Sequence, residues 1–178
     1  MTRPKAYEEV PGFRMTASPS PSELHSRVLE SYINVCADAV PVNFQRKTIW
    51  LAKRRIKPQQ DWWWIGGAMR AGETEEEAIV RKFKAETSLQ VAPERFKFVC
   101  LNRYYWKDRQ QAPQDRGCDC LAFTFLVELD DKELEVVIRG LDSHEYGAAS
   151  GLQEFDRQRL VEVHAHPAIL DFYNQVFS

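Results

Sequence analysis

The segment from Trp62 to Leu89, WWWIGGAMRAGETEEEAIVRKFKAETSL, places a short apolar run, two glycines and a helical pattern in direct succession. The run WWWI is typical of a short strand, and Gly66 and Gly67 allow a sharp turn at its end and a close backbone approach to a ligand. Thr74 is a good N-cap, and the three glutamates behind it occupy a first helical turn, where the positive end of the helix dipole favours them. The segment therefore predicts a strand, a glycine loop and a helix in that order.

A second pattern in this segment is the spacing of its charged residues. Five residues separate Gly67 from Glu73, and seven separate Glu73 from Arg81. Glu73 precedes the predicted helix and Arg81 lies two turns into it, so an ion pair between them would hold the loop against the helix. Positions 82, 85 and 86 follow at i, i+3 and i+4 and therefore share one face of the helix.

The segment resembles the signature of the Nudix hydrolases, G-x5-E-x7-R-E-U-x-E-E-x-G-U, in which U is a bulky aliphatic residue. The positions that agree are Gly67, Glu73, Arg81, Glu86 and Leu89, with Phe83 at the first U position. The resemblance implies an α/β fold, namely a Nudix-type α/β/α sandwich with a mixed β-sheet and a loop-helix-loop Nudix motif. It gives Gly67, Glu73 and Arg81 a structural role in that motif.

The helix face departs from this signature at two of its three acidic positions. In ordinary Nudix enzymes the carboxylates at positions 82, 85 and 86 bind magnesium and help to activate water for attack on phosphorus, but here Lys82 and Ala85 leave Glu86 alone. Ser88 replaces the closing glycine, which predicts a differently ended helix. One carboxylate suffices for magnesium when substrate phosphates and waters complete its octahedron. Mg2+ or Mn2+ at Glu86 is therefore still expected, without multi-metal attack at phosphorus.

The pattern R-x-x-x-A-E is similar to that of one branch of the family, the GDP-mannose mannosyl hydrolases, which keep a single carboxylate in the helix and cut the carbon–oxygen bond of the sugar. The likeness covers most of residues 22–177 and includes the stretches LAKRRIKPQQDWWWIGG, RYYW and VHAH. Ala68 departs from the branch because it replaces an arginine, for which Arg70 would compensate. Ser143 replaces a metal-binding glutamine, and the loop after His144 is longer than in the branch.

The likeness to this branch implies roles for individual residues. Arg54 would hold the diphosphate and, together with Arg70 and with His144 as general base, would form the catalytic set. Glu86 and the Gly66 carbonyl would bind the metal. The substrate-binding residues would be Asp38, Arg54, Lys57, Tyr104 and Tyr105, with one of the two tyrosines contacting phosphate or nucleotide.

Simpler explanations stay open for several of these residues. An i,i+4 ion pair with Lys82 on a solvated face would explain Glu86, and the Lys82 ammonium would alternatively lie near the diphosphate. The basic run 54–57 would be a solvated charge cluster. The rivals of His144 as base or metal ligand are its neighbours, Asp142 and Glu145.

The rest of the chain predicts helices and strands around this motif. The helices are expected over 22–30 and 167–177, a hairpin over 31–42 and 47–54, strands over 96–106 and 119–129, and a long mobile loop over 138–153. Residues 1–21 hold four prolines and predict a partly mobile N-terminal arm, followed by a single Nudix domain over 22–178. The arm could reach across a homodimer.

Composition limits the class of protein further. A net charge of −2 argues against a general nucleic-acid binder, and no apolar run approaches the ~20 residues that a membrane helix needs. The four cysteines stand singly or as one C-x-C pair and are expected to be buried as reduced thiols, not zinc ligands or disulfides. The start, MTRPKAYEEVPGF, has no apolar stretch typical of a signal peptide, so a cytoplasmic protein is expected.

Together these features predict a magnesium-dependent hydrolase that acts on a small nucleoside diphosphate linked to another group, with a nucleotide sugar as the first expectation. Two alternatives remain. One is a Nudix pyrophosphatase in which Glu73, Glu77 or the loop acids replace the lost ligands. The other is a catalytically silent Nudix domain that binds a nucleotide or a protein partner.

Overall fold

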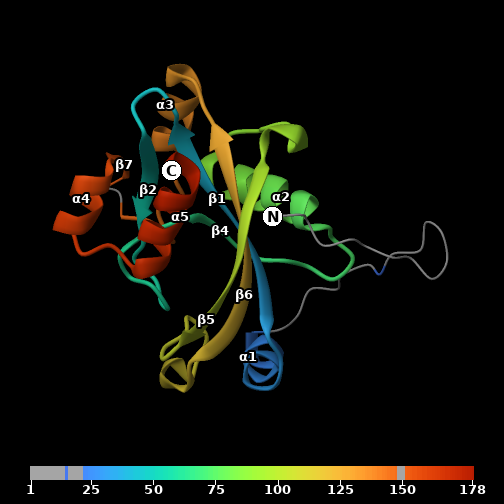
Figure 1. Cartoon of the computed structure of the whole chain (residues 1–178). Helices are drawn as coiled ribbons and strands as arrows, with labels where there is room; N and C mark the ends of the chain where they lie inside the picture. The colour runs from blue at the N-terminus through green and yellow to red at the C-terminus, as the bar shows by residue number, and fades with distance from the viewer. Residues whose placement is uncertain (1–14, 16–21, 148–150) are drawn as a thin grey trace.

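The computed structural model describes residues 15, 22–147 and 151–178 and places one mixed β-sheet between helices (Figure 1). The helices are α1 (Ser22–Ser31), α2 (Glu75–Thr87), α3 (Asp131–Gly140), α4 (Arg157–Glu162) and α5 (Pro167–Phe177). The strands are β1 (Asn34–Asn43), β2 (Thr48–Lys53), β3 (Trp62–Trp63), β4 (Ile65–Ala68), β5 (Lys97–Trp106), β6 (Cys118–Glu128) and β7 (Leu152–Phe155). The arm predicted over 1–21 lies, apart from Met15, outside the described residues.

The sheet runs in the order β3-β2-β1-β6-β5, with β4 paired to β1 and β7 paired to β2. β1 and β6 are parallel, with Asn34 opposite Cys120, and the other pairs are antiparallel. β1 therefore has β6 along one edge, whereas β4 and β2 divide its other edge between them. The predicted hairpin is confirmed, since β1 pairs with β2 at Val42 and Ile49.

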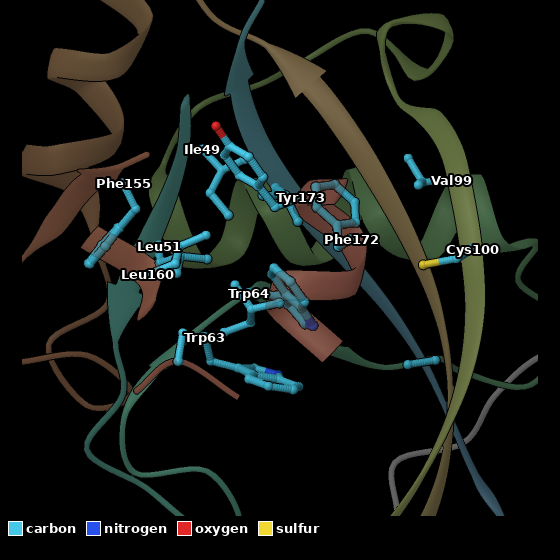
Figure 2. Close-up of a cluster of buried hydrophobic side chains, with 14 of the residues drawn as sticks. Ile49, Leu51, Trp63, Trp64, Val99, Cys100, Phe155, Leu160, Phe172 and Tyr173 are labelled. Atoms are coloured by element: carbon cyan, nitrogen blue, oxygen red, sulfur yellow. The ribbon is translucent and has the colours of Figure 1, made fainter. Parts of the chain in front are cut away.

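Side chains along β1 alternate between two hydrophobic cores, as the pleat of a strand requires. Val40 points into a core covered by α5, where Trp64 and Phe172 pack together (Figure 2). Ala39 points into the core on the opposite face, which is formed with side chains of α2 and α3. Helices thus cover both faces of the sheet, which confirms the predicted α/β/α sandwich.

α2 is the central helix that the sequence predicts between Thr74 and Ser88. The Thr74 hydroxyl accepts the Glu77 N–H at 3.2 Å, and the Glu77 carboxylate accepts the Thr74 N–H at 2.8 Å, which completes a capping box. Ser88 ends the helix with a φ of 63°, in the left-handed region. The closing glycine of the signature would adopt this conformation without strain. The different ending predicted from Ser88 is therefore a left-handed cap without glycine.

The prediction of a long loop over 138–153 is wrong at both ends. α3 continues to Gly140, and β7 begins at Leu152. A signal for α3 was present in the sequence, because Asp130 and Glu133 form a capping box at its start.

The glycine pair does not end a strand, as the sequence suggested, but lies inside β4. A Cβ atom at Gly66 would lie 2.3 Å from the Ala37 carbonyl oxygen of β1, and φ at Gly66 is +154°. Only glycine allows β4 to approach β1 so closely at this point.

All four cysteines are free, two of them buried and two half-buried. Within the part of the chain that the structure describes, no helix is both long and apolar enough to cross a membrane.

Candidate active site

A pocket of about 240 Å³ lies beside β1 on the face covered by α5. Its walls come from β1, β4, the neighbouring ends of β5 and β6 and the segment that follows β2, with further residues from α1 and α2. Of the residues predicted for the site, the pocket is lined by Asp38, Arg54, Lys57, Gly66, Gly67 and Tyr104. Segments distant in sequence therefore meet around one cavity.

Among the cationic side chains that line this pocket are those of Arg54, Lys57 and Lys82. The carboxylate of Glu145 lies between two of them, with oxygens 3.7 Å from Arg54 Nη2 and 3.9 Å from Lys82 Nζ. Charge-assisted hydrogen bonds are usually about 2.7–2.9 Å long, so both contacts are loose. Arg54 Nε is buried and makes no hydrogen bond to any described residue. An anion in the pocket would offer these donors closer acceptors.

The predicted ion pair between Glu73 and Arg81 is present. Arg81 donates through Nε to one oxygen of Glu73 and through Nη2 to the other at 2.8 Å, and Nη2 also reaches the Ala68 carbonyl at 3.1 Å. The hydrogen bonds from Arg81 lower the pKa of Glu73. Because Ala68 ends β4, this pair ties β4, the following loop and α2 together beside the pocket.

Glu86 forms the i,i+4 ion pair with Lys82 that its spacing allows. It is nevertheless only 2% exposed. Lys82 Nζ contacts Glu86 Oε1, whereas Oε2 accepts the Gly66 N–H at 3.1 Å and the Tyr146 hydroxyl. Burial raises the pKa of the Glu86 carboxyl, and the Lys82 ammonium opposes that rise. Burial and the adjacent Glu86 raise the pKa of Tyr146 well above its usual 10, so this hydroxyl remains a donor.

These contacts do not fit the predicted magnesium site at Glu86 and Gly66. One carboxylate oxygen meets two hydrogen-bond donors and the other meets a cation, while Gly66 offers Glu86 its N–H. Among residues 15, 22–147 and 151–178, no group of three or more His, Cys, Asp and Glu side chains could hold a metal ion. A metal ion at Glu86 would first have to displace the Lys82 ammonium.

Asp38 is buried on β1 directly opposite Gly66 of β4. Burial raises the pKa of its carboxyl from the usual 3.8 to about 7, with the Arg54 guanidinium lowering it and Glu86 raising it. Near neutral pH, Asp38 therefore exchanges a proton at the pocket wall.

Aromatic rings form another wall of the pocket. Trp63, Tyr104 and Trp106 line it together, with Tyr104 and Trp106 stacked at 5.3 Å and Trp63 edge-on to both at 5.5 Å. Tyr105, the other predicted tyrosine, is 74% exposed and lies against Arg103 instead. Successive residues of β5 point to opposite faces, so Tyr105 does not share the pocket with Tyr104.

Two predicted catalytic residues lie outside the lining of the pocket. His144 is exposed, and its backbone N–H donates to Asp142 at 2.9 Å. Arg70 is also exposed, and its backbone N–H donates to Glu73 at 2.8 Å. The acid that enters the pocket from the His144 segment is Glu145, because the Arg55 N–H binds the Glu145 carbonyl at 2.8 Å and fixes this segment against the strand end.

Arg109 was not predicted from the sequence, and it is buried in the pocket wall. Its Nη2 donates at 2.8 Å to both Ser26 and Glu30, so it joins the loop after β5 to α1. The partners lie about eighty positions away in the chain, and no local pattern marks such a contact.

Comparisons with known proteins agree with this architecture. A family model described as NUDIX domain matches residues 33–170. No curated protein matches the chain.

Several solved structures share its fold. A MutT NUDIX hydrolase from Burkholderia pseudomallei superposes with a TM-score of 0.61 at 20% identity, over 82% of this chain and 99% of that one. A MutT protein from Methanosarcina mazei Go1 gives 0.58 at 14% identity, over 83% and 94%, and the Ap4A hydrolase of C. elegans gives 0.51 at 11%, over 82% and 96%. At these identities the likeness concerns the fold alone. The family match, which covers most of the chain, together with the Gly67–Glu73–Arg81 motif in its strand–loop–helix setting, identifies this protein as a member of the Nudix hydrolase family.

Proposed function

We propose that this protein hydrolyses a nucleoside diphosphate linked to a second group, specifically a nucleotide sugar, by breaking the carbon–oxygen bond of the sugar. The Nudix family acts on small nucleotide-linked substrates. The observation that carries the proposal is the pocket itself, in which the cations of Arg54, Lys57 and Lys82 share one cavity with a wall of aromatic rings. A diphosphate joined to a planar base matches that combination.

The three cations suit the charge that develops during the reaction. When the bond between the sugar carbon and the diphosphate oxygen breaks, the nucleoside diphosphate leaves with the electron pair. Arg54 can offer paired N–H donors to its phosphate oxygens, and the ammonium groups of Lys57 and Lys82 add compact positive charge. Donors placed where negative charge develops lower the barrier of such a step.

Glu145 is the best-placed acceptor for the proton of the attacking water. It lies in the pocket, and its loose contacts to Arg54 and Lys82 are the ones that a phosphate would replace. Once these cations turn to the substrate, the carboxylate of Glu145 is free to take a proton from water as the oxygen adds to the sugar carbon.

The attacked atom separates this proposal from pyrophosphate cleavage. The helix carries Lys82 and Ala85 where attack at phosphorus would use carboxylates, which supports attack at carbon. A panel of nucleotide sugars, dinucleotides and nucleoside triphosphates should be hydrolysed in oxygen-18 water, with and without Mg2+. Label in the released sugar is expected. Label in phosphate would support a pyrophosphatase, and no turnover of any compound would support a silent binding domain.

Replacing Arg54 by alanine should lower kcat/KM by about 100-fold, because one preorganised donor to developing charge typically contributes that much. The matched control is Arg46→Ala, since Arg46 lies outside the pocket and pairs with Glu154 at the surface. Its effect on steady-state kinetics should stay below about 2-fold. Equal losses in the two variants would contradict the role of Arg54.

Replacing Glu145 by glutamine should lower kcat by about 100-fold or more, because a positioned base contributes that much. KM should not rise, since losing the carboxylate frees Arg54 and Lys82 for phosphate. His144→Ala is the control from the same turn and should change kcat by less than about 2-fold. Steady-state kinetics that show the reverse pattern would restore His144 as the base.

A further inference from the structure

We propose that the Lys82 ammonium occupies the place of a divalent cation in this site, so that the pocket binds the diphosphate of its ligand without metal and residue 82 decides whether metal is admitted. The inference takes its ligand class from the proposed function, but it concerns binding and does not require turnover. The contacts of Glu86 do not fit a magnesium site.

The Lys82 ammonium has neighbours on three sides. Lys82 Nζ contacts Glu86 Oε1 and lies 3.9 Å from Glu145 Oε1. A Cβ atom at Gly67 would meet Lys82 Cε at 3.0 Å and Nζ at 3.3 Å, so the lysine packs under the bare backbone of β4. Its side chain is 17% exposed and still lines the pocket. The ammonium is therefore held at the pocket wall, not extended into solvent.

The ammonium already supplies a positive charge beside Glu86. Glu86 lies near both Asp38 and Glu145, and Lys82 and Arg54 carry the positive charge that acts on these carboxylates. A divalent ion at Glu86 would displace the Lys82 ammonium from this carboxylate. The two cations would still repel each other, because they would remain close together. Lys82 and Arg54 thus already supply positive charge beside these carboxylates.

The same contacts leave the ammonium able to bind phosphate. Lys82 meets Glu86 as an ion pair, and an ammonium has three N–H donors, so donors remain for another acceptor. Glu145, at 3.9 Å, is too distant for a strong hydrogen bond. A phosphate oxygen can take the place of the Glu145 carboxylate and bridge Lys82 and Arg54. The ammonium would then neutralise phosphate charge, as a bound metal ion would.

Calorimetric titration of the full chain with GDP and with ADP tests the inference. For the wild type, the dissociation constant in EDTA should equal that in millimolar Mg2+ within about 3-fold. Lys82→Gln should weaken binding in EDTA by about 10-fold or more. Lys82→Glu should abolish binding in EDTA and create a Mn2+ site, seen by electron paramagnetic resonance, that the wild type lacks.

Lys84→Glu is the matched control, because Lys84 is an exposed lysine of the same helix and carries the same charge change. It should bind GDP as the wild type does and gain no Mn2+ site. Circular dichroism of each variant confirms that it is folded, and Lys82→Gln tests the ammonium without adding an acid.

The inference is overturned if wild-type binding requires Mg2+, if the wild type itself binds Mn2+ at this site, or if neither diphosphate binds under any condition. Its failure is separable from that of the proposed function. If GDP binds without metal but no nucleotide sugar is hydrolysed, the proposed function fails and the inference stands. If nucleotide sugars are hydrolysed only in the presence of Mg2+, the inference fails and the proposed function stands.

Discussion

Replacing Glu86 by alanine is expected to lower the free energy of unfolding by about 3–5 kcal/mol, the usual loss when one partner of a buried ion pair is removed. The Lys82 ammonium would lose its partner, and the Gly66 N–H and the Tyr146 hydroxyl would lose their shared acceptor. Each of these groups lies in or beside the core and cannot recover water fully. Urea unfolding at pH 7 measures the loss.

A second i,i+4 pair in the chain provides the control. Glu135 and Arg139 of α3 form a pair at 3.1 Å with side chains 65% and 80% exposed, so Glu135→Ala should cost less than about 1 kcal/mol. The double variant Lys82→Met with Glu86→Leu should recover most of the stability lost by Glu86→Ala, because it removes the unpaired charge as well. A loss below 1 kcal/mol for Glu86→Ala would show that the pair is solvated after all.

The contrast between these two pairs shows what the sequence can predict about the site. Both pairs have the same i,i+4 spacing, and that spacing does not distinguish a buried ion pair from an exposed one. Glu86 is buried because Tyr146, sixty residues later, closes over it and because β4 brings Gly66 to it. Those contacts depend on tertiary structure, which neither local spacing nor helix propensity encodes.

The central motif, by contrast, was predictable because its signals are local. Thr74 caps the helix through a hydrogen bond three residues away, and the Glu73–Arg81 pair spans eight. Such contacts follow from the sequence once the helix is recognised. The α/β/α sandwich was predicted from the resemblance of this motif to the Nudix signature.

The residues facing the pocket were less predictable because their orientation depends on pairing between distant strands. The alternation along WWW was visible in the sequence, but pairing of β3 with β2 determines that Trp63, not Trp62 or Trp64, lines the pocket. The choice between His144 and Glu145 depends likewise on one backbone hydrogen bond to Arg55. A shift of one residue would exchange the two side chains.

Replacing Asp38 by asparagine is expected to remove a pH dependence of stability between about pH 4 and pH 7. The pKa of Asp38 rises from 3.8 to about 7 in the folded chain, chiefly through burial, so the folded state binds this proton more tightly than the unfolded state does. The resulting stabilisation is fully present below pH 3.8 and is lost as the pH rises to about 7. A shift of about 3 units corresponds to about 4 kcal/mol.

The measurement is urea unfolding of both proteins at pH values from 4.5 to 8, followed as the difference in free energy between variant and wild type. Asparagine cannot ionise, so the difference should move in favour of Asp38→Asn as the pH rises and become constant above about pH 7. Asp115→Asn, at an exposed position outside the pocket, should give a constant difference throughout. A constant difference for Asp38→Asn as well would mean that Arg54 and Lys82 keep the carboxylate charged at all these pH values, and that burial does not dominate its titration.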